Sequence, residues 1–196
     1  MAGACTRGLL SHMIVIMSWE FSEQFIERAK RWRSYDQGAY LFHRGDPVRS
    51  LFAIETGEIA LVRPQHDGTT ITLQRATPLA VIAEASLYSR TYHCDAVIRS
   101  PSVVYEMSKH SVLKHLREDP AFSELWSSHL AAEVQQARYR SELMSRKTVA
   151  ERLDAWLDWH GTGLPPKGGW KNVATWIGVS PEALYRELSK RRKKSV

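Results

Sequence analysis

The chain has 196 residues, 43% of them hydrophobic, which is enough for one ordinary domain and a smaller second one. Its net charge of +6 is unevenly placed: residues 146–196 carry 11 Lys and Arg against 5 Asp and Glu, whereas residues 1–145 carry 16 of each sign. The two cysteines, Cys5 and Cys94, exclude a disulfide framework and a four-cysteine iron–sulfur cluster within one chain, and they suit the cytoplasm. A neutral front and a cationic C-terminal quarter predict a sensing part and a part that binds a polyanion such as nucleic acid.

The first residues predict an extension followed by a short helix. Residues 1–20 are interpreted as an N-terminal extension, because the apolar run 13–17 is too short to cross a bilayer. No association with a membrane is therefore expected. Over residues 21–32, up to Trp32, apolar residues recur at helical spacing, which predicts an amphipathic helix.

Residues 35–107 have the pattern of short antiparallel strands. β-branched, aromatic and leucine residues occur there in short runs separated by turn signals, which predicts a β sandwich or jelly roll. The turn signals are at residues 36–38, 44–47, 56–58 and 67–68. The clearest predicted strands are 51–54, 59–62 and 70–73, and Asp67-Gly68 is expected to close a hairpin between the last two.

Helix signals dominate from Ser108 onward. Ser108 is placed to cap a helix that runs through His115, and Pro120 opens a much longer one. In the longer helix, seven residues recur at alternating spacings of three and four, as in a heptad seam: Phe122, Leu125, His129, Ala132, Gln136, Tyr139 and Leu143. His129 and Gln136 suit a parallel pairing interface better than a sealed core, so the seam is predicted to form a dimer; packing on its own domain is the alternative.

A further helix over residues 147–159 is ended by the Gly- and Pro-rich segment 161–169. Residues 170–189 then fit a helix-turn-helix unit. Ala174 supplies the small residue where two helices cross, Gly178 the positive φ of the turn, and Leu184 the apolar anchor of the second helix. The residues expected to complete its small core are Val173, Ile177, Val179 and Leu188.

The second helix of this unit has the features of a DNA-reading helix. Ser180 is a suitable N-cap and Pro181 a suitable first helical residue. Arg186 can donate twice to guanine and Glu182 can accept from cytosine, although a surface ion pair between them is the simpler alternative. A run of five cations follows, and we interpret it as contacting phosphates. The predicted DNA contacts are Ser180, Glu182, Tyr185, Arg186, Ser189, Lys190, Arg191, Arg192, Lys193 and Lys194.

These features resemble the catabolite activator protein and fumarate-nitrate regulator (Crp/Fnr) superfamily. The likeness rests on the long helix, the helix-turn-helix and the sensor-domain pattern of Gly38, Phe42, 45–47, 51–52, Ile54, Gly57, Ile59 and 67–68. It implies an α+β fold: a cyclic-nucleotide-binding-like antiparallel β jelly roll over 21–118, a dimerisation helix over 119–145 and a C-terminal helix-turn-helix domain over 146–196. It also implies a homodimer that binds a pseudo-palindromic site in double-stranded DNA, with RNA polymerase as a further partner.

Two departures from the family pattern affect these expectations. Cyclic-nucleotide binders of the family have an Arg-Ser pair that holds the cyclic phosphate, but Cys94 and Asp95 stand there, and Glu84 remains from the polar set. Because a carboxylate repels a phosphate, cyclic AMP is not expected to bind a pocket formed by Glu84, Ser86, Cys94 and Asp95. The sequence given also ends seven residues after Ser189, so the usual wing is expected to be missing or truncated, with the basic tail in its place.

The effector is left open among several alternatives. Cys94 is either a small buried hydrophobe, with Asp95 capping a turn, or a redox- or metal-responsive thiol. His93 and Cys94 are adjacent on a predicted strand and are expected to point to opposite faces, so at most one could ligate haem or a metal. A regulator without a small effector is a further alternative. A jelly-roll enzyme would need several His converging on a metal, and the eight histidines are scattered, so neither enzymatic activity nor a metal site is predicted.

Overall fold

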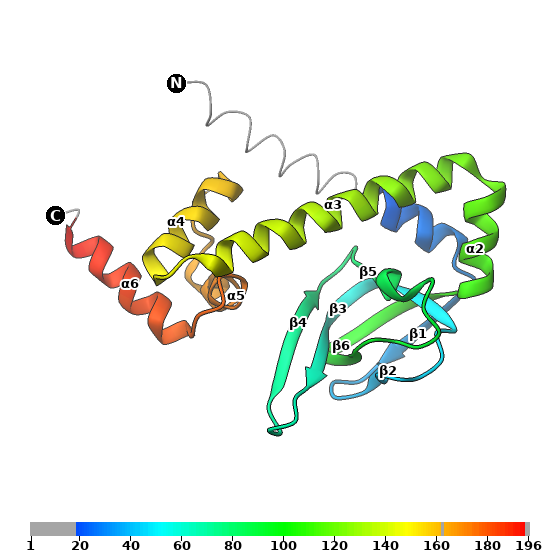
Figure 1. The fold of residues 1–196 in the computed structure, drawn as a ribbon, viewed down its shortest axis with the longest axis horizontal. Coiled ribbons are helices and arrows are strands. Elements are labelled where there is room, and N and C mark those ends of the chain that lie inside the picture. The colour runs from blue at the N-terminus through cyan, green and yellow to red at the C-terminus, as the bar shows by residue number, and fades with distance from the viewer. Residues whose placement is uncertain (1–18, 162, 195–196) are drawn as a thin grey trace. The chain divides into compact units, whose positions relative to one another are not determined.

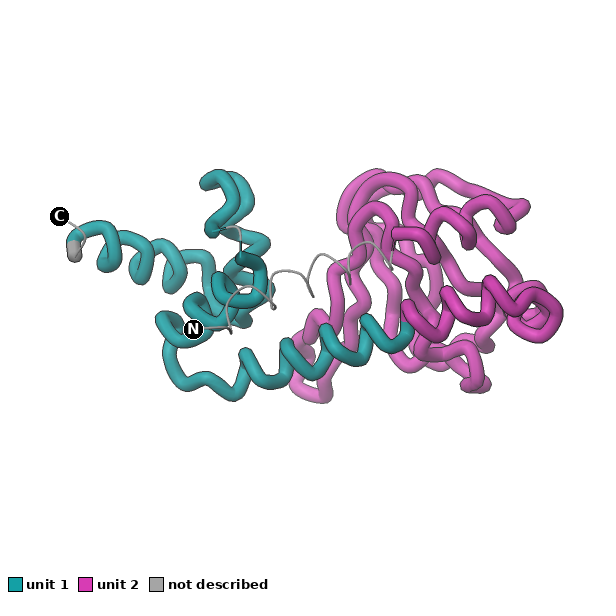
Figure 2. The backbone as a smooth tube through the Cα atoms, turned by 90° about the horizontal axis from the view of Figure 1, so that it is seen from above, with its two compact units in different colours: residues 1–16, 130–196 teal, residues 17–129 magenta. Residues whose placement is uncertain are grey.

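The structure is a computed structural model that describes residues 19–161 and 163–194, so the predicted extension 1–20 lies almost entirely outside the described residues. The chain folds as two compact units (Figure 2): one ends at His129, and the other contains the described residues from Leu130 onward. Among the described residues, no helix is both long enough and apolar enough to cross a membrane.

The first unit is built on a six-stranded antiparallel sheet with the order β1-β6-β3-β4, in which β2 also pairs with β6 and β5 with β3 (Figure 1). This arrangement agrees with the predicted α+β fold. The strands are β1 (Arg31–Tyr35), β2 (Tyr40–Phe42), β3 (Ser50–Pro64), β4 (Thr70–Ala76), β5 (Val81–Ile82) and β6 (Asp95–Ser108). The turn Asp67-Gly68 does connect β3 to β4: Asp67 accepts a hydrogen bond from the backbone N–H of Thr69, and Gly68 has a φ of +82°.

The residues expected to form two strands with a turn at 56–58 form the single strand β3 instead. The ladder with β6 shifts register on both sides of Thr56, so Gly57 is part of an irregular, bulged stretch and not of a chain reversal. Gly57 has a φ of +92°, and a Cβ atom there would lie 2.1 Å from the hydroxyl of Ser102. The residues at 56–58, predicted as a turn, therefore form a β-bulge. The same residue types occur in turns and bulges, and the pairing with β6 decides which of them forms.

Helices follow and precede the sheet. A helix over residues 19–28 precedes β1, and its Phe21 and Phe25 are completely buried. It ends four residues before Trp32, so the predicted helix 21–32 was too long at its C-terminal end. Trp32 instead pairs with Tyr105 across the β1–β6 ladder and is 61% exposed.

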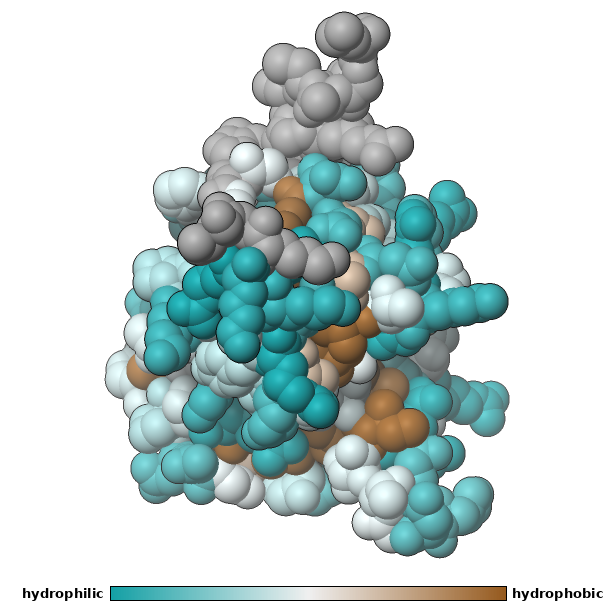
Figure 3. Space-filling model, turned by 90° about the vertical axis from the view of Figure 1, so that its left-hand side faces the viewer, coloured by the Kyte–Doolittle hydropathy of each residue, from teal (hydrophilic) through white to brown (hydrophobic). Residues whose placement is uncertain are grey.

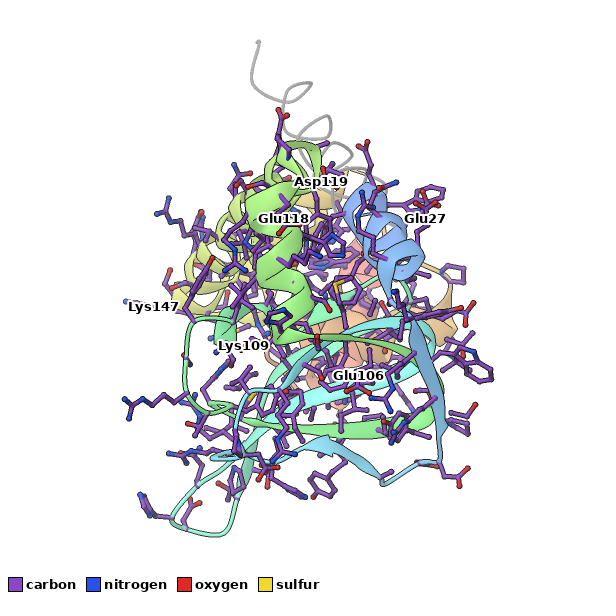
Figure 4. All side chains as sticks on the ribbon, turned by 90° about the vertical axis from the view of Figure 1, so that its right-hand side faces the viewer. Glu27, Glu106, Lys109, Glu118, Asp119 and Lys147 are labelled. Carbon is purple, nitrogen blue, oxygen red and sulfur yellow. The ribbon has the colours of Figure 1, made fainter. Side chains whose placement is uncertain are left out.

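Two helices, α2 (Lys109–Glu118) and α3 (Pro120–Ser145), come after β6. Ser108 accepts a hydrogen bond from the N–H of Ser111 and so caps α2 as predicted. Asp119 lies at the turn between these helices, close to the helix that carries Glu27 (Figure 4), and it forms a 2.9 Å ion pair with Arg28. The Arg28 guanidinium also lies 5.2 Å from the centre of the Phe122 ring.

The second unit packs the rest of α3 with α4 (Val149–His160), α5 (Trp170–Trp176) and α6 (Pro181–Lys194); a short 3-10 helix, η2 (Lys167–Gly169), precedes α5. Thr148 and Glu151 form a capping box at the start of α4, and Gly161 ends that helix in the left-handed conformation. The core of this unit consists of Tyr139, Leu143, Leu153, Trp156, Val173, Ala174, Ile177, Leu184 and Leu188.

The predicted heptad seam of α3 packs within one chain, which corrects its assignment as the dimer face. Phe122 and His129 are buried against Phe21, whose ring stacks on that of His129 at 4.7 Å. Tyr139 and Leu143 belong to the core of the second unit. Ala132 is also buried, whereas Leu125 and Gln136 are half-buried. Phe122, His129, Tyr139 and Leu143 therefore pack against elements of their own chain, as the alternative interpretation of the sequence expected.

Candidate DNA interface and effector pocket

The predicted helix-turn-helix is formed by α5, the turn around Gly178 and α6. Ala174 and Leu184 are completely buried where the two helices meet. Gly178 has a φ of +66°, a left-handed conformation that favours glycine, so the turn has the residue that its backbone requires. The hydroxyl of Ser180 accepts a hydrogen bond from the N–H of Ala183, which confirms Ser180 as the N-cap of α6.

Arg152 links the helix-turn-helix to α3 within the second unit. From α4, its guanidinium donates to four backbone carbonyls: those of Met144 and Arg146 at the end of α3, and those of Ile177 and Gly178 after α5. A cation is favourable at both places because each is the negative end of a helix dipole. No feature of the sequence singled out Arg152.

The exposed face of α6 carries cations in regular order. Arg186, Lys190 and Lys193 are exposed and are spaced by four and three residues, so they share one face of the helix, with Glu182 one turn earlier. Figure 3 views the side of the molecule on which α6 lies, where hydrophilic residues predominate. Hydrogen bonds from its own backbone N–H and from Ser180 lower the pKa of Glu182, and the positive charges of Arg186 and Lys171 act in the same direction.

Two other parts of the predicted interface differ from expectation. The helix continues through residues 190–194, so the basic run is the last part of α6 and not a tail beyond it. Arg191, predicted to contact phosphate, instead pairs with Asp154 and Glu187 and donates to the carbonyl of Ala150, because its position on α6 turns it toward α4. It joins these two helices.

The remaining predicted contacts lie around the cationic face. Arg192 is exposed, and Ser189 is half-buried. The half-buried Tyr185 ring lies 5.5 Å from that of Trp170, whose indole N–H donates to the carbonyl of Pro165. Tyr185 is thereby held at the side of α6 that faces the start of α5. The side chain of Lys194 lies outside the described part of the structure.

The β-roll unit contains a cavity of about 100 Å³ between β3, β4 and the short 3-10 helix η1 (Glu84–Ser86). Of the four predicted pocket residues, Glu84, Ser86 and Cys94 line this cavity. The other lining residues were not predicted: Phe42, Leu61, Leu73, Gln74, Ala83, Ala85 and His93. Leu73 lies at a register shift between β3 and β4, where Gln74 pairs with Leu61 and Thr72 with Val62, so this β-bulge helps to build the wall.

Asp95 does not belong to the pocket. Its carboxylate accepts a 2.6 Å hydrogen bond from the backbone N–H of Arg44, so it fixes the turn before β3, as the turn-capping alternative expected. His93 and Cys94 both line the cavity, which contradicts the expectation of opposite faces. The reason is that β6 begins only at Asp95, and the alternation of a strand does not apply to the bend before it.

The polar wall of the pocket is linked by hydrogen bonds and charge. Ser86 Oγ and His93 Nδ1 lie 2.9 Å apart. Burial lowers the pKa of His93, and the nearby charge of Arg63 lowers it further. Burial raises the pKa of the Cys94 thiol to about 11, so the group is protonated at neutral pH.

Comparison with known proteins agrees with this architecture. Residues 32–119 match the family model of the cyclic nucleotide-binding domain. No curated protein sequence matches the chain. The fold is similar to that of FixK2 from Bradyrhizobium japonicum, with a TM-score of 0.66 at 19% identity, over 85% of this chain and 86% of FixK2.

Two further structures show the same likeness. CLP of Xanthomonas campestris, a c-di-GMP-responsive global regulator, gives a TM-score of 0.60 at 18% identity over 90% of this chain and 92% of CLP. A CRP-family transcriptional regulator from Thermus thermophilus gives 0.57 at 17% identity over 83% and 85% of the two chains. Residues 32–119 are thus similar to the cyclic nucleotide-binding domain, and the chain has a fold similar to those of these three proteins.

Proposed function

We propose that this chain is a sequence-specific transcriptional regulator that binds double-stranded DNA as a homodimer and is controlled through its β-roll domain. The observation that carries the proposal is the exposed stripe of Arg186, Lys190 and Lys193 on the second helix of a well-packed helix-turn-helix. Such a helix fits the major groove with its N-terminal residues toward the base edges. The solved relatives are regulators, which also supports a non-enzymatic role.

Different residues of α6 have different tasks in this proposal. Arg186 lies one turn into the helix and is placed to donate to guanine, and Glu182 at the helix start is placed to accept from cytosine. Lys190 and Lys193 lie farther along the same face and neutralise backbone phosphates. The positive charge of Arg186 also helps to lower the pKa of Glu182, so Glu182 is a carboxylate that can accept from a base.

The dimer is proposed to form through the face of α3 opposite the packed seam. Ser127, Ala131, Val134, Arg138 and Ser141 are exposed and are spaced by four and three residues in alternation. Val134 is 48% exposed, which is a large fraction for a valine at the centre of a long helix. Burying this narrow stripe of mostly small residues against its copy would bring two long helices close together.

The alternative of a thiol sensor is less well supported by the surroundings of Cys94. A reactive thiol needs a lowered pKa and access to solvent. Cys94 is 1% exposed and its pKa is raised to about 11, which suits a small buried hydrophobe. Among residues 19–161 and 163–194, no group of three potential metal ligands is found.

Selection of duplexes from a randomised DNA pool by the full chain tests the proposal. We expect an inverted repeat whose half-site centres are about one helical turn, roughly 34 Å, apart. The Arg186→Ala variant should select a repeat with one relaxed position in each half. Recovery of no common sequence by the wild-type chain, at a salt concentration where it still retains DNA, would refute sequence-specific recognition.

A further inference from the structure

Met144 lies where the last turn of α3 meets the turn of the helix-turn-helix, within the second unit. The position that a Cβ atom of residue 178 would take is 2.6 Å from the Met144 sulfur and 2.8 Å from its methyl carbon, so the thioether lies directly against the Gly178 backbone. Nη1 of Arg152, which donates to the carbonyls of Ile177 and Gly178, is also 3.9 Å from the sulfur. One thioether therefore contacts both the turn and the guanidinium that connects the turn to α3.

The sulfur of Met144 is accessible to a small reagent. Met144 is half-buried and packs at the edge of the core of the second unit. Met107, on β6 of the first unit, is the other methionine of the described residues, and it is 2% exposed. Because oxidation needs access to the sulfur, a peroxide should modify Met144 well before Met107. Met1, Met13 and Met17 lie outside the described residues.

Oxidation would replace an apolar sulfur by a strong hydrogen-bond acceptor at this contact. One oxygen atom of hydrogen peroxide is transferred to the sulfur, which loses two electrons, and the other oxygen leaves as water. The sulfoxide oxygen accepts from Nη1 of Arg152 and so competes with the carbonyls of Ile177 and Gly178 for this donor. The close Gly178 backbone leaves little room for the added oxygen. Oxidation should therefore loosen the attachment of the turn to the end of α3.

We propose that Met144 is an oxidation site through which a peroxide weakens DNA binding by this chain. The inference rests on the proposed function, because DNA binding is the property that is regulated. The turn at Gly178 comes directly before α6, which carries the residues proposed to contact bases, so a loosened turn lowers the affinity for DNA. Enzymes that reduce methionine sulfoxide restore the thioether, so the modification is reversible.

Treatment of the full chain with hydrogen peroxide tests this inference. Mass spectrometry of the digested protein gives the fraction of sulfoxide at each methionine, and fluorescence anisotropy gives the DNA affinity before and after treatment. We expect Met144 to be oxidised ahead of Met107, and affinity for the selected inverted repeat to fall about tenfold, because hydrogen bonds of the Arg152 fork are lost. Dithiothreitol reverses the oxidation of thiols but not of methionine, so it should not restore the affinity, whereas methionine sulfoxide reductase should.

Variants of the two methionines identify the responsible sulfur. Met144→Leu keeps an apolar side chain of similar volume without a sulfur, so peroxide should leave its DNA affinity unchanged. Met107→Leu is the matched control and should respond to peroxide as the wild type does. Met144→Gln introduces a polar acceptor without any oxidant and should bind DNA more weakly than Met144→Leu. Equal losses for Met144→Leu and the wild type, or complete oxidation of Met144 with unchanged affinity, would refute the inference.

Hydrogen exchange reports on the turn without DNA, so failure of the oxidation site and failure of the regulator can be told apart. The N–H groups of Gly178 and Val179 donate to the carbonyls of Thr175 and Ala174. These amides should exchange faster after oxidation in the wild type but not in Met144→Leu. An untreated wild type that binds no DNA would refute the proposed function. DNA binding and amide exchange that both stay unchanged after oxidation of Met144 would refute the inference alone.

Discussion

His129 is the most unusual single residue of the β-roll unit. It is 2% exposed, its ring stacks on Phe21, and neither ring nitrogen has a hydrogen-bond partner within residues 19–161 and 163–194. Burial lowers its pKa from 6.5 to about 4. The unfolded chain therefore takes up a proton below about pH 6.5 that the folded chain does not accept until about pH 4.

The free energy of unfolding should consequently fall between pH 6.5 and 4 and be unaffected by this group above pH 6.5. At roughly 1.4 kcal/mol per pKa unit, the loss amounts to about 3 kcal/mol. His129→Phe keeps the aromatic contact with Phe21 and should remove this part of the acid destabilisation in urea unfolding at pH 7 and pH 4.5. His66→Gln, at an exposed turn position, is the control. An equal loss of stability in the wild type and in His129→Phe would contradict the explanation.

Single residues were predictable where a local rule decides them. Ser180, Gly178 and Ser108 were found because capping and positive φ depend on a few neighbouring residues. Asp95 and Arg191 were misplaced, because their partners, the Arg44 N–H and Asp154, are 51 and 37 residues away.

At the scale of elements, Arg152 connects α3, α4 and α5. Replacing it by Met should leave four carbonyls without this donor and should lower the unfolding free energy by about 1–3 kcal/mol. We also expect weaker DNA binding, because the turn at Gly178 loses its attachment to the end of α3. Arg152→Lys keeps the charge but not the fork of donors, so its effect should be intermediate.

Lys147→Met is the control for this experiment, since Lys147 is an exposed cation just before α4. Urea unfolding followed by circular dichroism gives the stability, and fluorescence anisotropy gives the DNA affinity. Arg152→Met with the stability and DNA affinity of the wild type would show that the four hydrogen bonds have no such role.

The helices were easier to predict than the strands. Ser108, Pro120 and Gly161 mark helix ends through their own chemistry, and the structure places the ends of α2, α3 and α4 beside them. The signal at 56–58 looks the same for a turn and a bulge, and pairing with β6, far along the chain, made it a bulge. Trp32 fits the helical period but lies on β1, because the ladder with β6 outweighs local periodicity.

At the scale of the whole molecule, the dimer is predicted to depend on the exposed face of α3. Val134→Glu would place a carboxylate opposite the same carboxylate of the partner chain, near the axis of the dimer. The variant should therefore be a monomer at micromolar concentration, as measured by sedimentation velocity. Gln135→Glu introduces the same charge about 100° around the helix and should leave the dimer intact. A Val134→Glu variant that sediments like the wild type would exclude this face as the interface.

The distribution of charge predicted a neutral N-terminal part and a cationic DNA-binding part. It did not predict which face of α3 forms the dimer. A heptad seam shows that one side of α3 is buried, and sequence alone does not tell whether its partner is another chain or the same one. Phe21, which stacks on His129, lies 108 residues earlier in the chain, so the intrachain answer required the fold. The cavity likewise depends on a bulge in β4 and on a bend before β6.

The central claim is that α6 reads DNA bases, and comparison of two variants on two duplexes tests it most directly. Fluorescence anisotropy at several salt concentrations is measured for Arg186→Ala and Lys193→Ala, each with the selected inverted repeat and with a random duplex. Arg186→Ala should lose about 1–3 kcal/mol on the selected duplex and much less on the random one. Lys193→Ala should weaken both duplexes alike and lower the slope of log affinity against log salt. Equal losses on both duplexes for Arg186→Ala would contradict base reading by α6.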